Sequence, residues 1–233
     1  MKILLLVIIT NGHSTGDMEI VKYMEDFYPP DYKYQQFGPH LTAQFFNATF
    51  WAELVAASGA KYFVFTSKHH DGFNNWPSKR NFGWNAQDIG PKRDVVGELA
   101  DAFRADDKVV FGLYHSLFEW YHPLYLEDKA NNRTTKYFVE EKMGPELMEL
   151  VNKYKPEVLW SDGDWEAHPD YWDTLTFLSW LYSESPVKDK IVTNDRWGRG
   201  TLCKHGDFFT CSDRYNPGVL QDHKWENAMT IDK

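Results

Sequence analysis

The stretch Lys61-Tyr-Phe-Val-Phe-Thr66, followed almost at once by Lys68-His69-His70-Asp71, sets the pattern for the whole chain. A short apolar run with a glycine before it (Gly59) and polar residues after it predicts a buried β-strand. The residues after the run carry groups capable of acid–base chemistry and hydrogen bonding. This stretch therefore predicts a strand whose carboxyl end bears functional side chains.

The same pattern recurs along the chain, with helical segments between the apolar runs. Further strands are predicted at 108–114, 157–160 and 190–193, with a fifth at 207–211. Helical spacing predicts helices over 49–58, 94–104, 136–153 (interrupted at Gly144-Pro145) and 171–182. The first helix should bury Phe50, Trp51, Leu54 and Val55, and the second Val95, Val96, Leu99 and Phe103.

Strands that alternate with helices predict an α/β fold with a parallel sheet and helices outside it. Polar residues follow each run: His69-His70-Asp71, His115-Ser116, Ser161-Asp162, Asn194-Asp195-Arg196 and Ser212-Asp213. In (β/α)₈ barrels the active site is assembled from the carboxyl ends of the strands, and this recurrence is typical of such an enzyme. The strands are fewer than a closed barrel contains, so the count indicates an open α/β sheet or an incomplete barrel.

Composition excludes some classes of function. The 233 residues carry a net charge of −9 and no basic stripe, which argues against nucleic-acid binding. No run approaches the roughly 20 apolar residues that cross a bilayer. Aromatic residues make up 17% of the chain. Most should belong to a large core, and some are expected to line a sugar site, where flat apolar faces meet the C–H faces of a pyranose.

Three kinds of feature bear on the compartment. Residues 1–10 form a short apolar segment that suits either a minimal secretory signal or a buried strand. Cys203 and Cys211 are either a local disulfide or two unrelated thiols. Asn47 and Asn132 each begin an Asn-x-Thr sequon, which is glycosylated only in the secretory route. Together these features favour a lysosomal or secreted protein.

Asp162 is the best candidate for a catalytic nucleophile. Glycoside hydrolysis needs two carboxyl groups facing one anomeric carbon, and Asp162 directly follows an apolar strand. An aspartate in this position also commonly caps a helix or closes a turn. His69 and His70 are adjacent and should point to opposite sides of an extended chain, so they form a poor metal site. Hydrogen bonding to sugar hydroxyls suits them better, and no metal or cofactor is expected.

Several segments together resemble the animal tissue α-L-fucosidases of glycoside hydrolase family 29. They are FGPHLTAQFF, SGAKYFVFTSKHHDGFNNWPS, RDVVGELADAFR, FGLYHSLFEWYHPLY, YKPEVLWSDGDWE, FLSWLYSESPVKDKIVTNDRW and DHKWE. They run in order from about residue 23 to 233. KHHDGF, LWSDGDWE and NDRWG are highly specific in combination. The resemblance implies a retaining exo-glycosidase that removes terminal α-L-fucose from glycoproteins or glycolipids.

The resemblance also assigns residues. Asp162 matches the nucleophile, and the residues that match sugar-site positions are His69, His70, His115, Trp160 and Arg196. The general acid/base stays open between Glu226, which fits the DHKWE motif, and Asp213, which follows the neighbouring predicted strand.

The chain departs from the family pattern at three places. Nothing before Tyr23 matches the family's opening F-G-x-F-x-H-W-G strand, Ala228 stands where the family usually has Cys, and the sequence stops at Lys233 before further barrel strands and a β-sandwich. We therefore expect an incomplete (β/α)₈ barrel that lacks the family's first and last strands. Residues 1–21 should form a signal-like or atypical segment, and residues 22–233 a partial glycosidase barrel.

Other classes of function remain open at the level of sequence. The missing first-strand histidine favours an inactive fucose-binding relative or a truncated fragment. A metal-dependent barrel hydrolase would need histidines and carboxylates converging on one point. The expected partner is a fucosylated glycan, and a homo-oligomer is compatible with the sequence.

Overall fold

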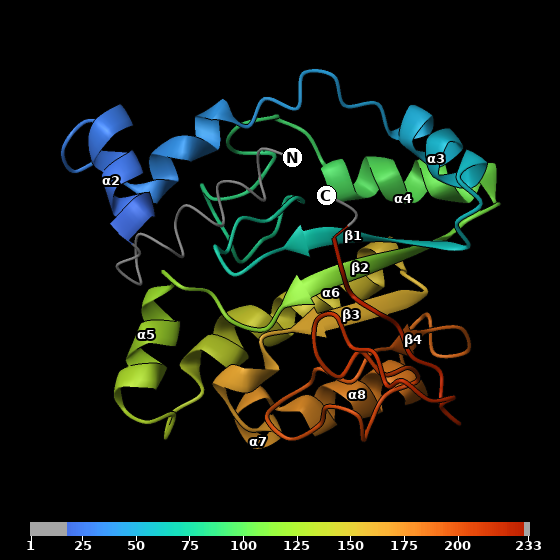
Figure 1. Cartoon of the computed structure of the whole chain (residues 1–233). Coiled ribbons are helices and arrows are strands. Elements are labelled where there is room, and N and C mark those ends of the chain that lie inside the picture. Colours follow the sequence, from blue (N-terminus) through green and yellow to red (C-terminus); the bar gives the residue numbers. More distant parts are fainter. Residues whose placement is uncertain (1–17, 231–233) are drawn as a thin grey trace.

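The computed structural model describes residues 18–230 and contains one parallel sheet (Figure 1). Its strands are β1 (Tyr62–Lys68), β2 (Val110–Ser116), β3 (Val158–Asp162) and β4 (Val192–Thr193), paired in the order β1-β2-β3-β4. The helices are α2 (Met18–Phe27), η1 (Tyr34–His40), α3 (Ala48–Ala57), α4 (Val95–Asp106), α5 (Pro123–Ala130), η2 (Val139–Met143), α6 (Gly144–Tyr154), η3 (Asp164–Glu166), α7 (Pro169–Trp172) and α8 (Thr174–Ser183).

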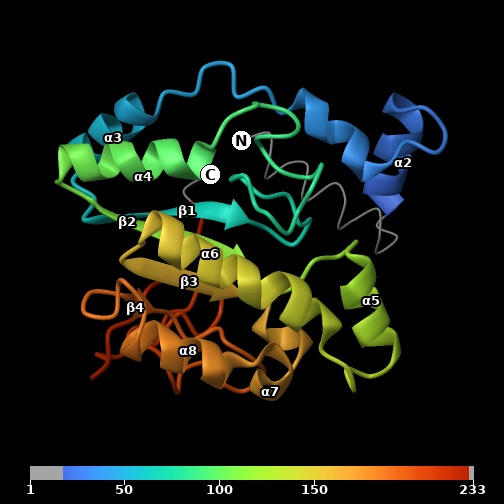
Figure 2. The same cartoon turned by 180° about the vertical axis from the view of Figure 1, so that it is seen from behind.

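The two faces of the sheet are covered differently. Helices α4, α6 and α8 lie behind the sheet in Figure 1 and in front of it in Figure 2, so they cover one face. The chain after β4 runs across the other face. Parallel strands in chain order, with helices on one side only, form a segment of a barrel wall. The predicted α/β fold with a parallel sheet is confirmed.

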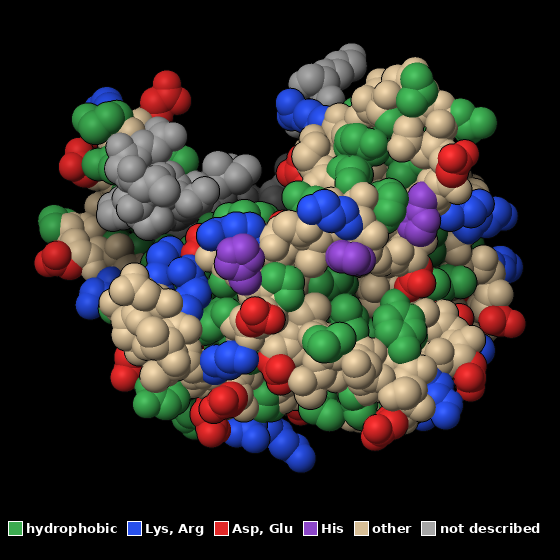
Figure 3. All heavy atoms as spheres, turned by 90° about the horizontal axis from the view of Figure 1, so that it is seen from below, with side chains coloured by type: hydrophobic (Ala, Val, Ile, Leu, Met, Phe, Trp, Pro, Cys, Tyr) green, Lys and Arg blue, Asp and Glu red, His purple; other side chains and the backbone are tan. Residues whose placement is uncertain are grey.

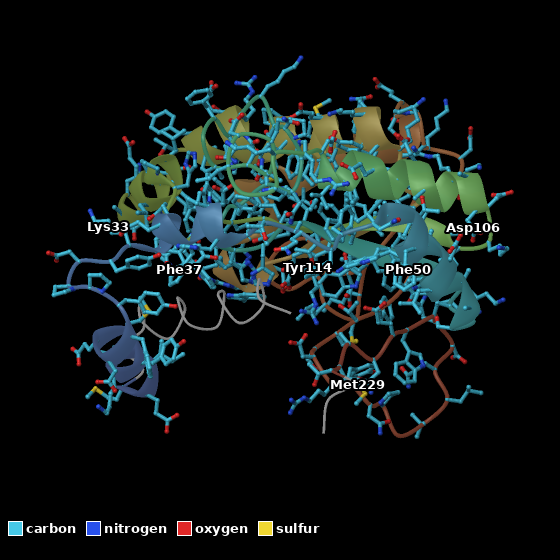
Figure 4. All side chains as sticks on the ribbon, turned by 90° about the horizontal axis from the view of Figure 1, so that it is seen from above. Lys33, Phe37, Phe50, Asp106, Tyr114 and Met229 are labelled. Carbon is cyan, nitrogen blue, oxygen red and sulfur yellow. A yellow bond between two sulfur atoms is a disulfide. The ribbon has the colours of Figure 1, made fainter. Side chains whose placement is uncertain are left out.

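Alternation along the strands sorts their side chains between these faces. Phe63, Phe65, Phe111, Leu113 and Leu159 pack into the main hydrophobic core with the helices. Tyr114 and Trp160 stack on each other with ring centroids 5.4 Å apart, and they lie on the other face together with Asp162. Figure 4 shows Tyr114 between the helical layer and the C-terminal segment that carries Met229. The inner face of the barrel wall is therefore where the polar strand ends meet.

A bulge near the end of β1 changes the direction of its last side chains. The register slips between Thr66 and Lys68, so that Thr66 pairs with Tyr114 but Lys68 pairs with His115. Ser67, the extra residue, is fully buried and donates its hydroxyl to the Tyr114 carbonyl oxygen at 2.7 Å. A bulge re-aims the residues that follow it, which often happens beside active sites.

Helix α4 confirms the predicted face, because Val95, Val96, Leu99 and Phe103 are all buried. The face predicted for the preceding helix is only partly right, because Val55 packs against the core and the Trp51 ring contacts Phe63, whereas the other two residues are exposed. In α3, Phe50 and Leu54 are each 57% exposed. Besides Val55, the helix packs through Ala48, Ala52 and Ala56, which share one side at four-residue spacing. Small side chains allow the backbones of α3 and α4 to approach closely, and this outweighs the burial that the larger residues would gain.

The predicted interruption at Gly144-Pro145 takes the form of a π-helical turn. The Gly144 amide donates to the Val139 carbonyl five residues earlier, and α6 continues directly from η2. Proline has no amide hydrogen and its ring crowds the preceding turn, so a widened turn accommodates it without ending the helix. The helix predicted over 171–182 is divided at Asp173, whose φ of 51° is left-handed and ends α7 before α8 begins.

The strand predicted at 207–211 does not form. Only a single bridge joins Phe209 to Trp225 among the residues described. Gly206 and Cys211 have φ angles of 123° and 53°, which end the extended conformation on both sides. The Thr210 and Cys211 amides donate to the Asp195 carboxylate at 2.9 and 3.1 Å, so they are not available to a sheet.

Strand β4 is shorter than the predicted 190–193 for a related reason. After Thr193, the Asn194 side chain takes over the pairing with β3. Its Oδ1 accepts from the Ser161 amide at 2.9 Å, and its Nδ2 donates to the Ser161 carbonyl oxygen at 2.8 Å. A side-chain amide can replace a backbone peptide in this way because it offers the same donor and acceptor.

The N-terminal prediction is only partly covered by the structure. Residues 1–17 of the signal-like or atypical segment lie outside the described residues, and residues 18–21 belong to α2. None of the helices within residues 18–230 is long and apolar enough to cross a membrane. On the face shown in Figure 3, Lys and Arg side chains are interspersed with Asp and Glu.

Candidate active site

Asp162 ends β3 on the inner face, and its two carboxylate oxygens have different partners. Oδ1 accepts a hydrogen bond from Arg196 Nη1 at 3.0 Å, and Oδ2 accepts one from the Tyr114 hydroxyl at 2.7 Å. The carboxylate is buried yet compensated by a full positive charge. Burial and the negative charge of Asp162 raise the pKa of Tyr114 well above its ordinary value, so this phenol remains a proton donor.

Arg196 joins two carboxylates. Its Nη2 donates to Asp213 Oδ1 at 2.7 Å, beside the bond from Nη1 to Asp162. Burial by itself would lower the pKa of Arg196. The hydrogen bonds to Asp213 and Asp162 and the negative charges of these two residues have the larger effect, so the pKa of Arg196 is raised above its ordinary value. Both carboxylates are bonded to one planar guanidinium, so they lie a few ångströms apart at one edge of the sheet. We call Asp162, Arg196 and Asp213 the carboxylate site.

Aromatic rings form the walls beside the carboxylate site. The Arg196 guanidinium lies 4.7 Å from the centre of the Trp160 ring, and Trp160 in turn stacks on Tyr114. The His69 ring is nearly parallel to that of Tyr114, with centroids 5.5 Å apart. A layer of flat rings next to paired carboxylates is the arrangement that a sugar site requires.

His70 approaches the second oxygen of Asp162. Its Nε2 lies 3.6 Å from Asp162 Oδ2, while its Nδ1 is held by the Ser116 hydroxyl at 2.6 Å. Burial, followed by the neighbouring His69 and Lys68, lowers the pKa of His70 to about 2. The imidazole is therefore neutral, and its approach to Asp162 is not an ion pair. Burial also lowers the pKa of His69, although the Asp162 charge opposes this.

Glu226, the other acid/base candidate, is bonded to Trp160 and Tyr62. Its Oε1 accepts from Trp160 Nε1 at 2.7 Å, and its Oε2 accepts from the Tyr62 hydroxyl at 3.1 Å. Tyr62 begins β1 and pairs with Val110, six residues before Ser116, whereas Ser116 pairs with Asp162. At about 3.3 Å per residue, the backbone of Tyr62 therefore lies ~20 Å from that of Asp162 along the strand direction. Glu226 also lines a cavity of about 500 Å³ together with Tyr62 and Val110.

His115 is not brought to the carboxylate site. It is fully buried on the helix side of β2, where its Nδ1 lies 3.1 Å from the Ser67 hydroxyl. The reason is strand alternation, because Tyr114 faces inward and the next residue must face outward. Burial and then the charges of Lys68 and Lys142 hold the pKa of His115 well below its ordinary value.

A second group of charges lies behind the histidines. The Lys68 ammonium is 2.8 Å from Glu119 and 3.8 Å from Glu146, and the Lys142 ammonium is 2.9 Å from Glu119 and 2.7 Å from Glu146. All four side chains are at most 5% exposed. This buried charge cluster ties the residue before His69 to the loop after β2 and to the π-helical turn.

Comparison with known proteins identifies the family. The model of the family described as "Alpha-L-fucosidase" matches residues 8–233. The chain belongs to the alpha-L-fucosidase family. It is 60% identical to the plasma alpha-L-fucosidase of Homo sapiens over 213 residues, which cover 91% of this chain and 46% of the relative. It is 60% identical to an alpha-L-fucosidase of Branchiostoma floridae over 93% of this chain and 49% of the relative.

Solved structures agree with this assignment. The Thermotoga maritima alpha-fucosidase in complex with a mechanism-based inhibitor has a TM-score of 0.71 and 33% identity, covering 88% of this chain and 46% of that one. Another alpha-L-fucosidase structure has a TM-score of 0.76 and 32% identity, covering 93% and 48%. The sheet is consistent with the expected partial (β/α)₈ barrel. The chain spans about half the length of the relatives it matches.

Three residues near the carboxylate site were not singled out by sequence: Tyr114, Asp164 and Thr210. Burial and then the charge of Asp162 raise the pKa of Asp164 to about 6. Tyr114 could have been found from the alternation of side chains along β2, because it faces the same side of the sheet as Ser116, which pairs with Asp162. Thr210 had no such signal, because its position depends on a loop.

Cys203 and Cys211 form a disulfide, with Cα atoms 5.0 Å apart. Asp195 is the third potential metal ligand close to these two sulfurs. Since the sulfurs are bonded to each other, they do not supply the thiolates that a metal would need. Asn47 and Asn132, the two sequon residues, are both exposed, and Asn47 caps α3 by accepting from the Phe50 amide at 3.0 Å.

Proposed function

We propose that this chain carries the catalytic groups of a retaining α-L-fucosidase that works by double displacement. The observation that supports this most strongly is the single guanidinium of Arg196 bonded to both Asp162 and Asp213. Glycoside hydrolysis uses two carboxyl groups roughly 5–9.5 Å apart, the shorter separations belonging to retaining enzymes. Family membership adds independent support for fucose as the sugar.

Asp162 is the proposed nucleophile. In the first step a carboxylate oxygen of Asp162 attacks the anomeric carbon, the bond to the aglycone oxygen breaks, and an acid gives that oxygen a proton. In the second step the same group, now a base, takes a proton from water, which attacks the anomeric carbon and releases Asp162. Two inversions give α-L-fucose from an α-L-fucoside. The bonds from Arg196 and Tyr114 hold the attacking carboxylate in one orientation.

We favour Asp213 over Glu226 as the acid/base. Asp213 shares Arg196 with Asp162, and its side chain is 77% exposed, so it can exchange protons with water. Glu226 is bonded to Trp160 and Tyr62, on the side of the cavity that extends towards the beginning of β1. A proton donor has to reach the leaving oxygen of the same sugar that the nucleophile attacks, and the contacts of Asp213 suit this better.

The proposed substrate is a glycan with terminal fucose. Neutral His69 can both donate to and accept from sugar hydroxyls. Neutral His70 can accept through Nε2, since its Nδ1 hydrogen is used by the Ser116 hydroxyl, which itself donates to the Phe118 carbonyl oxygen. Trp160 offers a flat apolar surface. We keep His115 out of this set because of its burial. The disulfide and the names of the plasma and tissue relatives support a secreted or lysosomal location.

The decisive experiment replaces the nucleophile. Asp162→Gly should lower the release of chromophore from an aryl α-L-fucoside by on the order of 10⁴-fold. Azide should partly restore turnover and yield a fucosyl azide, because the small anion fits the space left by the carboxylate. The parent chain assayed with azide is the control. Undiminished turnover in Asp162→Gly would contradict the assignment. If the parent binds fucose in calorimetry but does not turn over, the chain is an inactive fucose-binding relative.

A second comparison tests the acid/base. Asp213→Asn and Glu226→Gln remove one proton donor each while preserving shape. We expect Asp213→Asn to slow aryl fucosides with poor leaving groups by about 10²–10³-fold and to affect activated leaving groups much less, because these need little protonation. Glu226→Gln should show no such dependence on the leaving group. The reverse pattern would transfer the role to Glu226.

A further inference from the structure

Asp195 has a prominent hydrogen-bonding position that the proposed chemistry does not use directly. It is fully buried, and its carboxylate accepts four hydrogen bonds from one loop. Oδ1 accepts from the Thr210 amide at 2.9 Å and from the Thr210 hydroxyl at 2.6 Å. Oδ2 accepts from the Cys203 amide at 2.7 Å and from the Cys211 amide at 3.1 Å. A carboxylate with all its partners inside one loop fixes the shape of that loop.

The hydroxyl of Thr210 links Asp195 to the carboxylate site. Arg196 Nε donates to Thr210 Oγ1 at 2.9 Å. Arginine has no acceptor, and a hydroxyl has one hydrogen, so the Thr210 hydroxyl must accept from Arg196 and donate to Asp195. The other two Arg196 nitrogens donate to Asp162 and Asp213. The guanidinium is therefore fixed on one side by Thr210 and presents its other side to both carboxylates.

The disulfide closes the same loop. It joins the two residues whose amides bind Asp195 Oδ2, and both have left-handed φ angles, 56° at Cys203 and 53° at Cys211. Asp213 follows Cys211 by two residues. At Gly206, within the loop, a Cβ atom would lie 2.7 Å from the Asn194 carbonyl oxygen, so the loop packs directly on the chain beside Asp195.

We propose that Asp195 is a positioning residue, which acts through Thr210 and the disulfide-closed loop to set Arg196 and Asp213 relative to Asp162. This inference rests on the proposed function, since it describes how the same two carboxylates are aligned. Asp195 itself touches neither of them in the contacts described. It holds the residues that do. Misplacing a catalytic group by about 1 Å can lower the rate on the order of 10²-fold.

The test uses Thr210→Val, which removes the hydroxyl and keeps the shape, together with Asp195→Asn. Both should lower kcat for an aryl α-L-fucoside by about 30–100-fold with KM within about 3-fold. Thr210→Ser retains the hydroxyl and should restore most of the rate. Asp207→Asn is the matched control, because its carboxylate accepts from the Thr193 amide and the Tyr182 hydroxyl and, within residues 18–230, is not among the hydrogen-bond partners of Arg196. It should leave kcat unchanged.

A second readout separates this inference from the proposed function. The Arg196 Nε–H signal in a ¹⁵N NMR spectrum should exchange slowly with water in the parent and quickly in Thr210→Val. If the parent turns over, the inference needs both the loss of kcat and the faster exchange, and either one unchanged overturns it. If the parent does not turn over, the proposed function fails for this chain. The exchange rate alone then decides whether Asp195 and Thr210 position Arg196.

Discussion

The carboxylate site and the buried charge cluster each include a residue at a strand end, Asp162 and Lys68, but they balance charge differently. In the buried charge cluster, two lysines and two glutamates contact one another in all four combinations, within 2.7–3.8 Å. In the carboxylate site, one arginine serves two aspartates, and the Asp213 side chain is 77% exposed. The first group is closed and neutral, and the second is open and has an excess of negative charge.

The difference separates structural from chemical use of charge. A balanced group of buried ions holds its neighbours in place, because losing any member leaves an uncompensated charge away from water. A carboxylate that shares its cation and reaches solvent can change partner or protonation state during a reaction. Substitutions in the two groups should therefore move different measured quantities, stability for one and rate for the other.

The largest effect is expected in the buried charge cluster. Lys142→Met leaves Glu119 and Glu146 with one lysine between them and should lower the free energy of unfolding by about 3–5 kcal/mol, measured by urea denaturation. Lys22→Met is the control, since its pair with Asp26 is exposed and should matter little. A small loss in Lys142→Met would show that the cluster is hydrated rather than sealed.

The next effect concerns rate at the carboxylate site. Arg196→Lys keeps the charge but cannot bond Asp162, Asp213 and Thr210 at once. We expect kcat/KM on an aryl fucoside to fall about 10²-fold, or ~2.7 kcal/mol, while the unfolding free energy changes little. Arg199→Lys, whose exposed guanidinium bonds backbone carbonyls, is the matched control. Equal values of kcat/KM in both variants would show that the rate does not depend on the three hydrogen bonds of Arg196.

The pH dependence of stability gives a further test at His70, which lies beside Asp162. The pKa of His70 is about 2 in the folded chain, mainly because of burial and then because of His69 and Lys68, with Asp162 also facing it. Below an ordinary histidine pKa of about 6.5 the unfolded chain binds a proton that the folded chain does not. Stability present above pH 6.5 is therefore lost as the pH falls, by about 2 kcal/mol between pH 6.5 and 5 from this group.

His70→Gln removes that contribution. Its unfolding free energy should fall less steeply between pH 6.5 and 5 than that of the parent, as followed by urea denaturation at several pH values. The comparison uses slopes, because the substitution also removes the bond to Ser116 at every pH. Identical slopes would mean that the imidazole is hydrated and titrates in the folded chain.

The smallest effect should come from Tyr114. Tyr114→Phe removes the hydroxyl that donates to Asp162 Oδ2 and should lower kcat/KM about 10-fold, or ~1.4 kcal/mol. The ring and its stacking on Trp160 remain. Tyr182→Phe, which loses hydroxyl contacts to Asp207 and Thr193, should keep the parental rate. A loss in Tyr182→Phe as large as in Tyr114→Phe would point to a general structural cause.

The sequence predicted the fold class and several residues of the candidate site from local patterns. The apolar runs became β1 to β4, and the polar residues after them supplied Asp162, His70 and Arg196. Predictions failed where packing or side-chain hydrogen bonds outweighed the pattern. The outward Phe50 and Leu54 of α3 reflect close helix packing through alanines, and the absent strand at 207–211 reflects amides taken by Asp195.

Local patterns in the sequence were enough to predict which residues reach the carboxyl ends of the strands, because periodicity and the alternation of apolar and polar segments are local properties. Which of these residues meet depends on the tertiary structure. His115 and His70 are separated because of the bulge at Ser67 and because His115 faces the helix side of β2. The loop closed by the disulfide between Cys203 and Cys211 brings Asp213 to Arg196. The meeting of side chains distant in sequence depends on register, loop closure and burial, which are fixed only when the whole chain packs.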